Sequence, residues 1–289
     1  MDVRAIFMGL AFVVFWSSAF SSARIIVDAA PPISALSVRF FLSGGIAIAL
    51  ASAFGQSWRL DRAQWRATIL FGICQNTLYL GLNFYALLTV EASVAVIIAS
   101  LLPLLVALAG LLFFGERLSW LAYAGLVAGF VGVLLIMSGR MEAGLDLGGV
   151  ALCVGGVLAL TFATLAVRTA TSAGNLLMIV GLQMVVGAIP LGIVGVATET
   201  LSVSWSWAFV AAFTYTLLFP GLVATFVWFR LVNRIGATRA ATFHFLNPFF
   251  GVMIAFLLLG EELGSWDLVG VAIVAAGILA VQVARQRGT

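Results

Sequence analysis

Long apolar runs separated by short polar breaks follow one another along the whole chain of 289 residues. A transmembrane helix needs about 20 consecutive apolar residues to cross a hydrocarbon core roughly 30 Å thick. The runs that meet this length are residues 5–24, 33–53, 65–88, 92–114, 118–138, 148–168, 174–197, 207–231, 239–259 and 266–284. The breaks between them carry proline, glycine and charge, as at Pro31-Pro32 and Gly139-Arg140, and leave no room for an extramembrane domain. The pattern predicts an all-α membrane protein with ten transmembrane helices.

An internal repeat divides these helices into two sets of five. With an offset of 145 residues (248 minus 103), Pro103 aligns with Pro248 and Gly115-Glu116 aligns with Gly260-Glu261, without gaps across a whole helical hairpin. We therefore predict two five-helix repeats, residues 1–140 and 145–289. Because each repeat crosses the membrane an odd number of times, the second is expected to be inverted relative to the first.

The positions of the arginines predict which side of the membrane holds the termini. All 14 basic residues are arginine, and short cytoplasmic loops of membrane proteins are enriched in basic residues. Those expected on the side of the N-terminus are Arg4, Arg59, Arg62, Arg66, Arg117, Arg168, Arg230, Arg234, Arg239, Arg285 and Arg287. Only Arg24, Arg39 and Arg140 fall on the other side. This predicts a multi-pass protein of the cell (inner) membrane with both termini in the cytoplasm.

Composition excludes several classes of protein. Hydrophobic residues make up 63% of the chain and charged residues 9%, whereas soluble domains carry about 45–50% and about 25%. A water-soluble enzyme and a disordered chain are therefore excluded, and the scattered arginines form no patch for nucleic acid. Cys74 and Cys153 lie inside apolar runs without a second cysteine or a histidine at metal-binding spacing, so we interpret them as small buried hydrophobes. We expect no metal and no cofactor.

Several short motifs together resemble one transporter family. They are Trp16-Ser17-Ser18-Ala19-Phe20, Gly115-Glu116-Arg117-Leu118, Gly236-Ala237-Thr238-Arg239-Ala240-Ala241-Thr242, Asn247-Pro248 and Leu259-Gly260-Glu261-Glu262-Leu263. The set resembles the EamA-type branch of the drug/metabolite transporter superfamily. The resemblance implies ten helices in two inverted repeats, no cofactor, and a central cavity surrounded by helices 1, 3, 4, 6, 8 and 9. Members of that branch mostly move amino acids, metabolites or drug-like compounds. The family often has a carboxylate before the second proline, and here Asn247 stands there.

The two aligned prolines are the first candidates for a solute site. Proline donates no backbone hydrogen bond, so Pro103 and Pro248 are expected to free the carbonyls of Ala99 and His244. Matched interruptions in the two halves of an inverted repeat point to a binding site near the midplane. The alternative is that both prolines only curve their helices for packing.

Polar and aromatic side chains inside the runs complete the candidate cavity. His244 is the one histidine. It either faces a cavity, where it would bond a solute carboxylate or take up a proton near neutral pH, or is a neutral ring bonded to a neighbour such as Asn247 or Ser100. Asn76, Tyr79 and Asn83 share one helical face, as ligand contacts or as links between helices. The predicted cavity residues are Trp16, Asn76, Tyr79, Asn83, Ser100, Thr161, Phe162, His244 and Asn247.

Four further features are explained mainly by helix packing, helix capping or the membrane surface. Thr161-Phe162 lies one repeat after Trp16-Ser17, and such aromatics line a ligand or simply pack. Arg39 lies about six residues inside the second run, deep enough to need either a partner or extension of its charge to the membrane surface, and we favour the extension. Glu116 and Glu261 are expected to cap the helix that follows each hairpin. The glycines of the fifth and tenth runs, Gly125, Gly129, Gly132, Gly270 and Gly277, are expected to let helices pack closely within the monomer, or to form a weak dimer face.

The resemblance implies a secondary carrier that exports amino acids or similar small metabolites, and the paired helix interruptions favour alternating access. The alternatives are a drug-like compound efflux carrier and a passive solute pore or scramblase. An enzyme is not expected, because paired acids, a metal cluster or a nucleophile with its base are missing, and no nucleotide-binding motif is present. The expected partners are a small-molecule solute and the lipid bilayer, with no nucleic acid, and the protein is expected to be a monomer or a weak homodimer.

Overall fold

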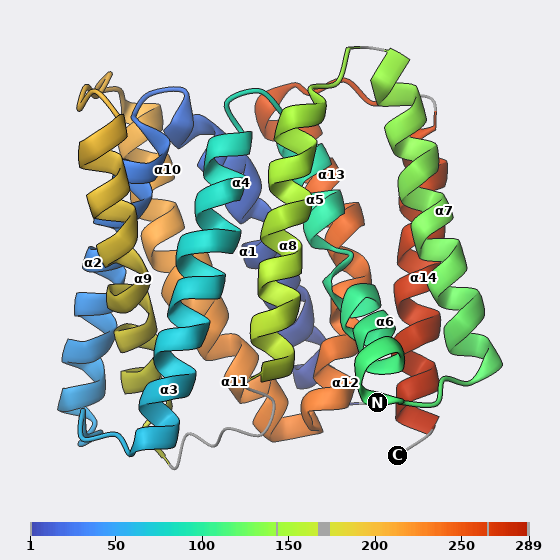
Figure 1. The fold of residues 1–289 in the computed structure, drawn as a ribbon, viewed down its shortest axis with the longest axis horizontal. Helices are drawn as coiled ribbons and strands as arrows, with labels where there is room; N and C mark the ends of the chain where they lie inside the picture. Colours follow the sequence, from blue (N-terminus) through green and yellow to red (C-terminus); the bar gives the residue numbers. More distant parts are fainter. Residues whose placement is uncertain (1, 143, 167–173, 265, 288–289) are drawn as a thin grey trace. The chain divides into compact units, whose positions relative to one another are not determined.

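The computed structural model describes residues 2–142, 144–166, 174–264 and 266–287, and this part of the chain is helical with short connections. In the first repeat the helices are α1 (Val3–Val27), α2 (Pro32–Ala53), α3 (Arg62–Phe71), η1 (Gly72–Tyr79), α4 (Leu80–Ala86), α5 (Ala92–Ala99), α6 (Leu102–Phe114) and α7 (Trp120–Glu142). In the second they are α8 (Leu147–Ala166), α9 (Leu176–Thr198), α10 (Trp207–Leu218), η2 (Phe219–Val223), α11 (Ala224–Ile235), α12 (Ala237–Thr242), η3 (Phe243–Leu246), α13 (Asn247–Leu259) and α14 (Asp267–Arg287). Figure 1 labels the α-helices.

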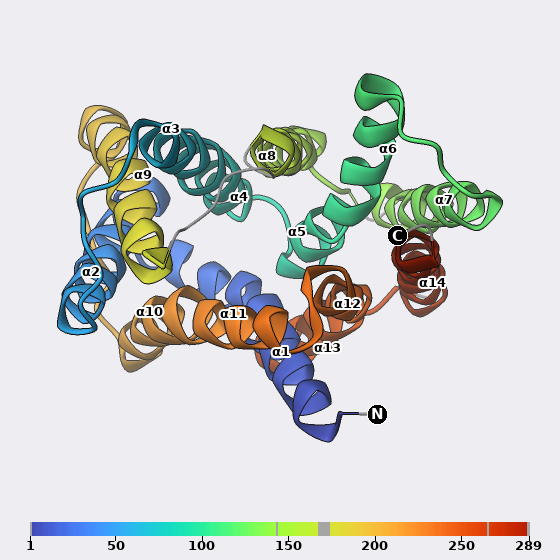
Figure 2. The same ribbon diagram turned by 90° about the horizontal axis from the view of Figure 1, so that it is seen from below.

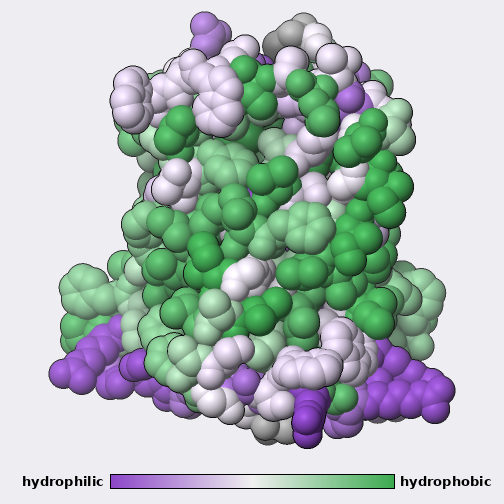
Figure 3. Space-filling model, turned by 90° about the vertical axis from the view of Figure 1, so that its left-hand side faces the viewer, coloured by the Kyte–Doolittle hydropathy of each residue, from purple (hydrophilic) through white to green (hydrophobic). Residues whose placement is uncertain are grey.

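The predicted spans are found with small changes at their ends. Among the described residues, nine helical stretches are long and apolar enough to cross a membrane. The remaining predicted span, 65–88, is also helical, but π-helical η1 divides it between α3 and α4. The end of the predicted sixth span, with Arg168, lies outside the described residues. On the face shown in Figure 3, hydrophobic side chains cover the middle and hydrophilic ones gather along the lower edge, as expected of a membrane protein.

The chain forms two compact units, and each takes helices from both sequence repeats. Unit 1 consists of residues 1–21, 89–150 and 223–289, and unit 2 consists of residues 22–88 and 151–222. The fourth, fifth, ninth and tenth predicted spans belong to unit 1, whereas the second, third and seventh belong to unit 2.

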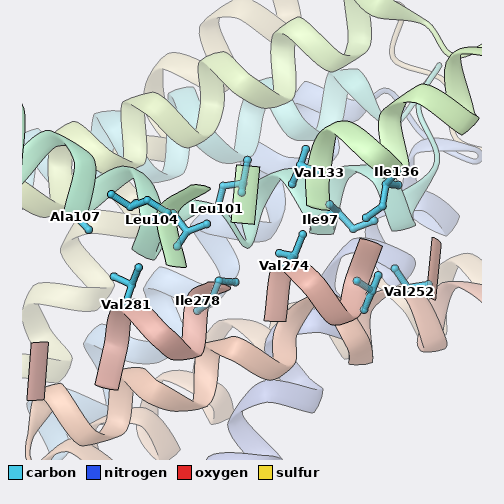
Figure 4. Packing of buried hydrophobic residues seen from close by; sticks show 12 residues of the cluster. Ile97, Leu101, Leu104, Ala107, Val133, Ile136, Val252, Val274, Ile278 and Val281 are labelled. Carbon is cyan, nitrogen blue, oxygen red and sulfur yellow. The ribbon is translucent and has the colours of Figure 1, made fainter. Parts of the chain in front are cut away.

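The core of unit 1 is an apolar cluster shared by α5, α6, α7, α13 and α14. Figure 4 shows its side chains meeting between the helices. Its members are Ile97, Leu101, Leu104, Ala107, Leu126, Val133, Ile136, Val252, Val271, Val274, Ile278 and Val281. Helices from both repeats therefore share one core.

Glycines bring α7 and α14 into close contact inside unit 1. A Cβ atom on Gly277 would lie 2.6 Å from the carbonyl oxygen of Gly125, and one on Gly132 would lie 2.9 Å from that of Gly270. Rising numbers on α7 meet falling numbers on α14, so the two helices are antiparallel, as the side-by-side ribbons in Figures 1 and 2 show. The predicted packing role of these glycines within the monomer is confirmed.

The two Gly-Glu hairpins lie at opposite ends of unit 1. Glu261 accepts hydrogen bonds from the backbone N–H groups of Ala92 and Ser93, at 2.7 and 3.0 Å, where α5 begins. Glu116 follows the end of α6 and lies 3.8 Å from Arg285, near the end of α14. The expectation that Glu261 caps its following helix is wrong, because its carboxylate caps a helix of the other repeat instead. The opposite placement of the hairpins agrees with the predicted inversion.

A buried ionic cluster joins α7, α14 and the start of α5 at the same end of unit 1 as Glu261. Arg140 donates from Nη2 to Asp267 at 2.6 Å and to the hydroxyl of Ser93 at 3.3 Å. It also forms an ion pair with Glu91. Asp267 in turn accepts from the N–H of Gly264 at 2.8 Å. The cluster ties three helix ends together.

In unit 2, α2 and α9 lie side by side (Figures 1 and 2) and run antiparallel. A side chain just after each helix caps the start of the other. Glu199, just after α9, accepts from the N–H groups of Ile33 and Ser34 at 2.9 and 2.8 Å. Gln56, after α2, accepts from the N–H of Met178 at 2.9 Å. These bonds satisfy N–H groups that a helix leaves without an internal partner.

Candidate functional site

The helix that carries Pro248 changes its winding just before the proline. Residues Phe243–Leu246 form a 3₁₀ turn, η3, between α12 and α13. Within it the N–H of Asn247 donates to the carbonyl of His244. The expected free carbonyl at His244 is therefore wrong, because the tighter turn supplies the donor that the proline lacks. The predicted interruption itself is present.

At the matching interruption before Pro103, the polar side chain of Ser100 bonds within its own helix. Helix α5 ends at Ala99 and α6 begins at Leu102. Ser100 is buried, and its hydroxyl donates to the carbonyl of Val96 at 2.7 Å. Ser100 is thus satisfied by its own helix.

The 3₁₀ turn places His244 in a cage of three aromatic rings, all within unit 1. The His244 ring meets Phe12 and Trp16 of α1 edge-on, with centroids 5.3 and 5.9 Å away and interplanar angles of 83° and 89°. The ring of Trp228 on α11 lies 5.3 Å away at 63°. Trp16 and His244 were predicted as site residues, whereas Phe12 was missed. The signal for Phe12 was its position four residues before Trp16, on the same helical face.

Asn247 holds the imidazole in place. Its amide nitrogen lies 2.8 Å from Nδ1 of His244, and the carbonyl of Asn247 accepts from the hydroxyl of Ser17 on α1 at 3.3 Å. When Nδ1 accepts from the amide, the proton of the neutral ring sits on Nε2. Among the described residues Nε2 has no hydrogen-bond partner. Oδ1 of Asn247 is buried and likewise has none.

The predicted polar face of the third span is split between two neighbours in unit 2. Asn76 donates to the carbonyl of Gln183 on α9 at 2.9 Å. Asn83 donates instead to the carbonyl of Tyr79 in its own helix at 2.7 Å, and this amide lies against Gly156 of α8. The expectation of one shared face is wrong because a π-helix has more residues per turn than the α-helix assumed, which rotates Asn76 away.

The two candidates on α8 also lie in unit 2 and differ in exposure. Thr161 is buried, with its hydroxyl donating to the carbonyl of Val157 at 2.8 Å. Phe162 is 59% exposed. Trp16, Ser100, Pro103, His244, Asn247 and Pro248 belong to unit 1, whereas Asn76, Tyr79, Asn83, Thr161 and Phe162 belong to unit 2.

Arg39 is placed differently from the prediction. Arg39 is only 5% exposed, and its guanidinium carbon lies 4.5 Å from the ring centre of Phe40 and 5.6 Å from that of Phe84. Its side chain is therefore enclosed within unit 2 rather than extended to an exposed surface. The depth of Arg39 along its helix was readable from the sequence, but the two rings that enclose it were not.

No group of three or more metal-ligating side chains occurs among the described residues. Cys74 and Cys153 are both buried free thiols.

Comparison with known proteins decides the family. The profile of the EamA-like transporter family matches the chain twice, over residues 3–138 and 147–282. The chain belongs to the EamA-like transporter family. It is thus a membrane transporter of the drug/metabolite transporter superfamily and not an enzyme, and the predicted all-α fold of two inverted five-helix repeats is confirmed.

Relatives of this EamA-like protein cover almost its whole length. The uncharacterized transporter YvbV of Bacillus subtilis is 24% identical over 94% of this chain and 90% of its own. The uncharacterized inner membrane transporter YedA of Escherichia coli K12 is 23% identical over 92% of this chain and 87% of its own. A solved crystal structure covers 100% of both chains with a TM-score of 0.71 and 19% identity, which shows the same fold.

Proposed function

We propose that this EamA-like protein is a secondary carrier that exports amino acids or similar small metabolites across the inner membrane by alternating access. Membership of a transporter family supports a small-molecule solute. The likeness to an inner membrane transporter supports the location. The two matches to the family, over residues 3–138 and 147–282, support alternating access, because carriers of this kind rock one repeat against the other around a fixed site. We propose that these repeats extend over residues 1–140 and 145–289.

The observation that carries the proposal is the caged imidazole of His244. Polar groups inside a membrane helix are costly unless they meet a partner, and they mark substrate pathways. Here Nε2 has no partner among the described residues, while the rings of Phe12, Trp16 and Trp228 surround the imidazole. A solute with a polar end and an apolar body matches these two kinds of surface.

Counterflow into proteoliposomes tests the proposal directly. A panel of labelled amino acids and their neutral analogues should include a solute whose uptake saturates and is accelerated by the same solute on the other side. His244→Ala should then weaken apparent affinity by about 1–3 kcal/mol, roughly 5- to 150-fold, because a solute group loses its hydrogen-bond partner. Phe256→Ala is the matched control, since Phe256 lies on α13 but is 43% exposed. Unchanged affinity in His244→Ala would place the site elsewhere.

The same assay separates the other functions. Uptake that rises linearly with concentration and shows no counterflow would indicate a passive pore or scramblase. Saturable transport restricted to bulky drug-like compounds would indicate a drug efflux carrier.

We also propose that both termini lie in the cytoplasm, on the basis of the arginine distribution. Single cysteines near Glu116 and Glu261, labelled from outside whole cells, test this. Only the cysteine near Glu261 should react, and reaction at both would contradict the topology.

A further inference from the structure

Arg39 is the one buried arginine of unit 2 among the residues that the structure describes. It is the eighth residue of α2, so at 1.5 Å per residue its Cα lies about 10 Å along the axis from Pro32. Only 5% of the surface of Arg39 is exposed. Burying a cation at this depth is expensive and normally demands a paired anion.

That anion is missing from the described part of the protein. Arg39 forms no ion pair and no hydrogen bond with any described residue, and its Nε is fully buried without a partner. The described acids of unit 2 are engaged elsewhere. Asp28 pairs with Arg24, Asp61 caps α3, and Glu199 caps α2.

The surroundings of Arg39 leave only the polar edge of the guanidinium available. Phe40 and Phe84 lie against its carbon at 4.5 and 5.6 Å, as cation–π contacts. Such contacts return only part of the cost of burying the charge. The ring faces also block hydration of the planar group from those directions. Unlike Nε, neither of the two terminal nitrogens of the guanidinium is both fully enclosed and without a partner, so they are the atoms still able to donate to a ligand.

We propose that Arg39 binds the carboxylate of the transported solute. A guanidinium matches a carboxylate by two parallel hydrogen bonds. One buried arginine balances one negative charge, so the charge count favours a monocarboxylate over a phosphate dianion. This inference rests on the proposed carriage of a small solute and names its chemical class.

Thermal unfolding of the purified protein in micelles tests the inference with benzoate as the probe. Benzoate at about ten times its Kd for the wild type should raise the Tm of the wild type by about 3 °C. It should raise the Tm of Arg39→Lys by less, because the ammonium group keeps the charge but not the two parallel hydrogen bonds. It should leave Arg39→Gln unchanged. Neutral benzamide should have no effect, and inorganic phosphate a smaller one. Arg24→Gln is the matched control, because Arg24 is already paired with Asp28, and it should respond to benzoate like the wild type.

The Tm without any ligand gives a second readout. Arg39→Gln should unfold at the same temperature as the wild type or higher, because it removes an unpaired buried charge. A lower Tm, or failure to fold, would mean that Arg39 is structural and would overturn the inference. Three results of the benzoate experiment would also overturn the inference. These are no shift of the wild-type Tm, an equal shift in Arg39→Gln, and a shift smaller than the one that phosphate causes. Counterflow by the wild type would still stand in those cases, so the two proposals fail separately.

Discussion

Replacing Asp267 by asparagine should destabilise the protein strongly, because the substitution removes one charge from the buried ionic cluster of unit 1. Asp267 is 2% exposed and Arg140 is 8% exposed. The carboxylate of Asp267 accepts from Nη2 of Arg140 at 2.6 Å and more weakly from its Nε at 3.4 Å. Asparagine keeps the size and one acceptor oxygen but not the charge.

The magnitude follows from what remains around Arg140. A hydrogen bond to a charged group contributes about 1.5–3 kcal/mol, and leaving a buried charge without its partner costs about 3–5 kcal/mol. Glu91 remains paired with Arg140, although its side chain is 46% exposed, so the loss should be partly compensated. We expect Asp267→Asn to lower the free energy of unfolding by about 2–4 kcal/mol.

Unfolding by SDS titration in mixed micelles measures this difference. Asp28→Asn is the matched control, since the pair of Asp28 with Arg24 is largely exposed and spaced i, i+4 where α1 ends. That change should cost only about 0.3–0.5 kcal/mol. The double variant Asp267→Asn with Arg140→Gln should be more stable than Asp267→Asn alone, because no unpaired buried charge remains. Glu91 then loses its partner, but its side chain is 46% exposed and can be hydrated. Equal losses for Asp267→Asn and Asp28→Asn would refute the reasoning.

Two further predictions concern packing and pH. Gly277→Ala should cost about 1–3 kcal/mol of stability, because its methyl group would lie 2.6 Å from the carbonyl oxygen of Gly125; Gly45→Ala, which meets nothing within 4 Å, should be neutral or stabilising in the same titration. The hydroxyl of Thr89, then two backbone N–H groups at the start of α8, hold the pKa of Asp146 below its ordinary value. The charged form is thus favoured in the folded state, so the stabilisation is present above about pH 4, the ordinary value, and is lost as the pH falls through the lowered pKa. Thr89→Val should therefore lower the Tm at pH 7, and its deficit relative to the wild type should shrink in acid; a deficit that is constant with pH would contradict this account.

Apolar run length and the internal offset predicted most of the fold. Run length predicts a membrane helix well, because the thickness of the bilayer sets it. The π-helical segment η1 was not predictable in this way, because its altered winding does not change the length or the composition of the apolar run. This π-helical segment accounts for the wrong prediction of a common face for Asn76 and Asn83.

The candidate site was predictable only where neighbours in space are also neighbours in the sequence. His244 and Asn247 lie one turn apart, so their contact could be expected. The rings around Arg39 come from two helices, one of them 45 residues further along the chain (84 minus 39). The carboxylate of Glu261 binds N–H groups 169 and 168 residues away. Contacts of this range depend on how helices pack, which no local pattern encodes.

The crossed capping by Glu199 and Glu261 has a consequence for how the protein is made. Both carboxylates belong to the second repeat, and the helix starts that they cap, at Ile33 and Ala92, belong to the first. A ribosome that has finished the first repeat has therefore inserted two helices whose opening N–H groups still bond to water at the membrane edge. Their final partners emerge more than a hundred residues later. We therefore expect a chain truncated between the repeats to leave the translocon with these helix starts uncapped, and to be degraded by membrane proteases. The two halves of this transporter are thus expected to complete their fold together rather than one after the other.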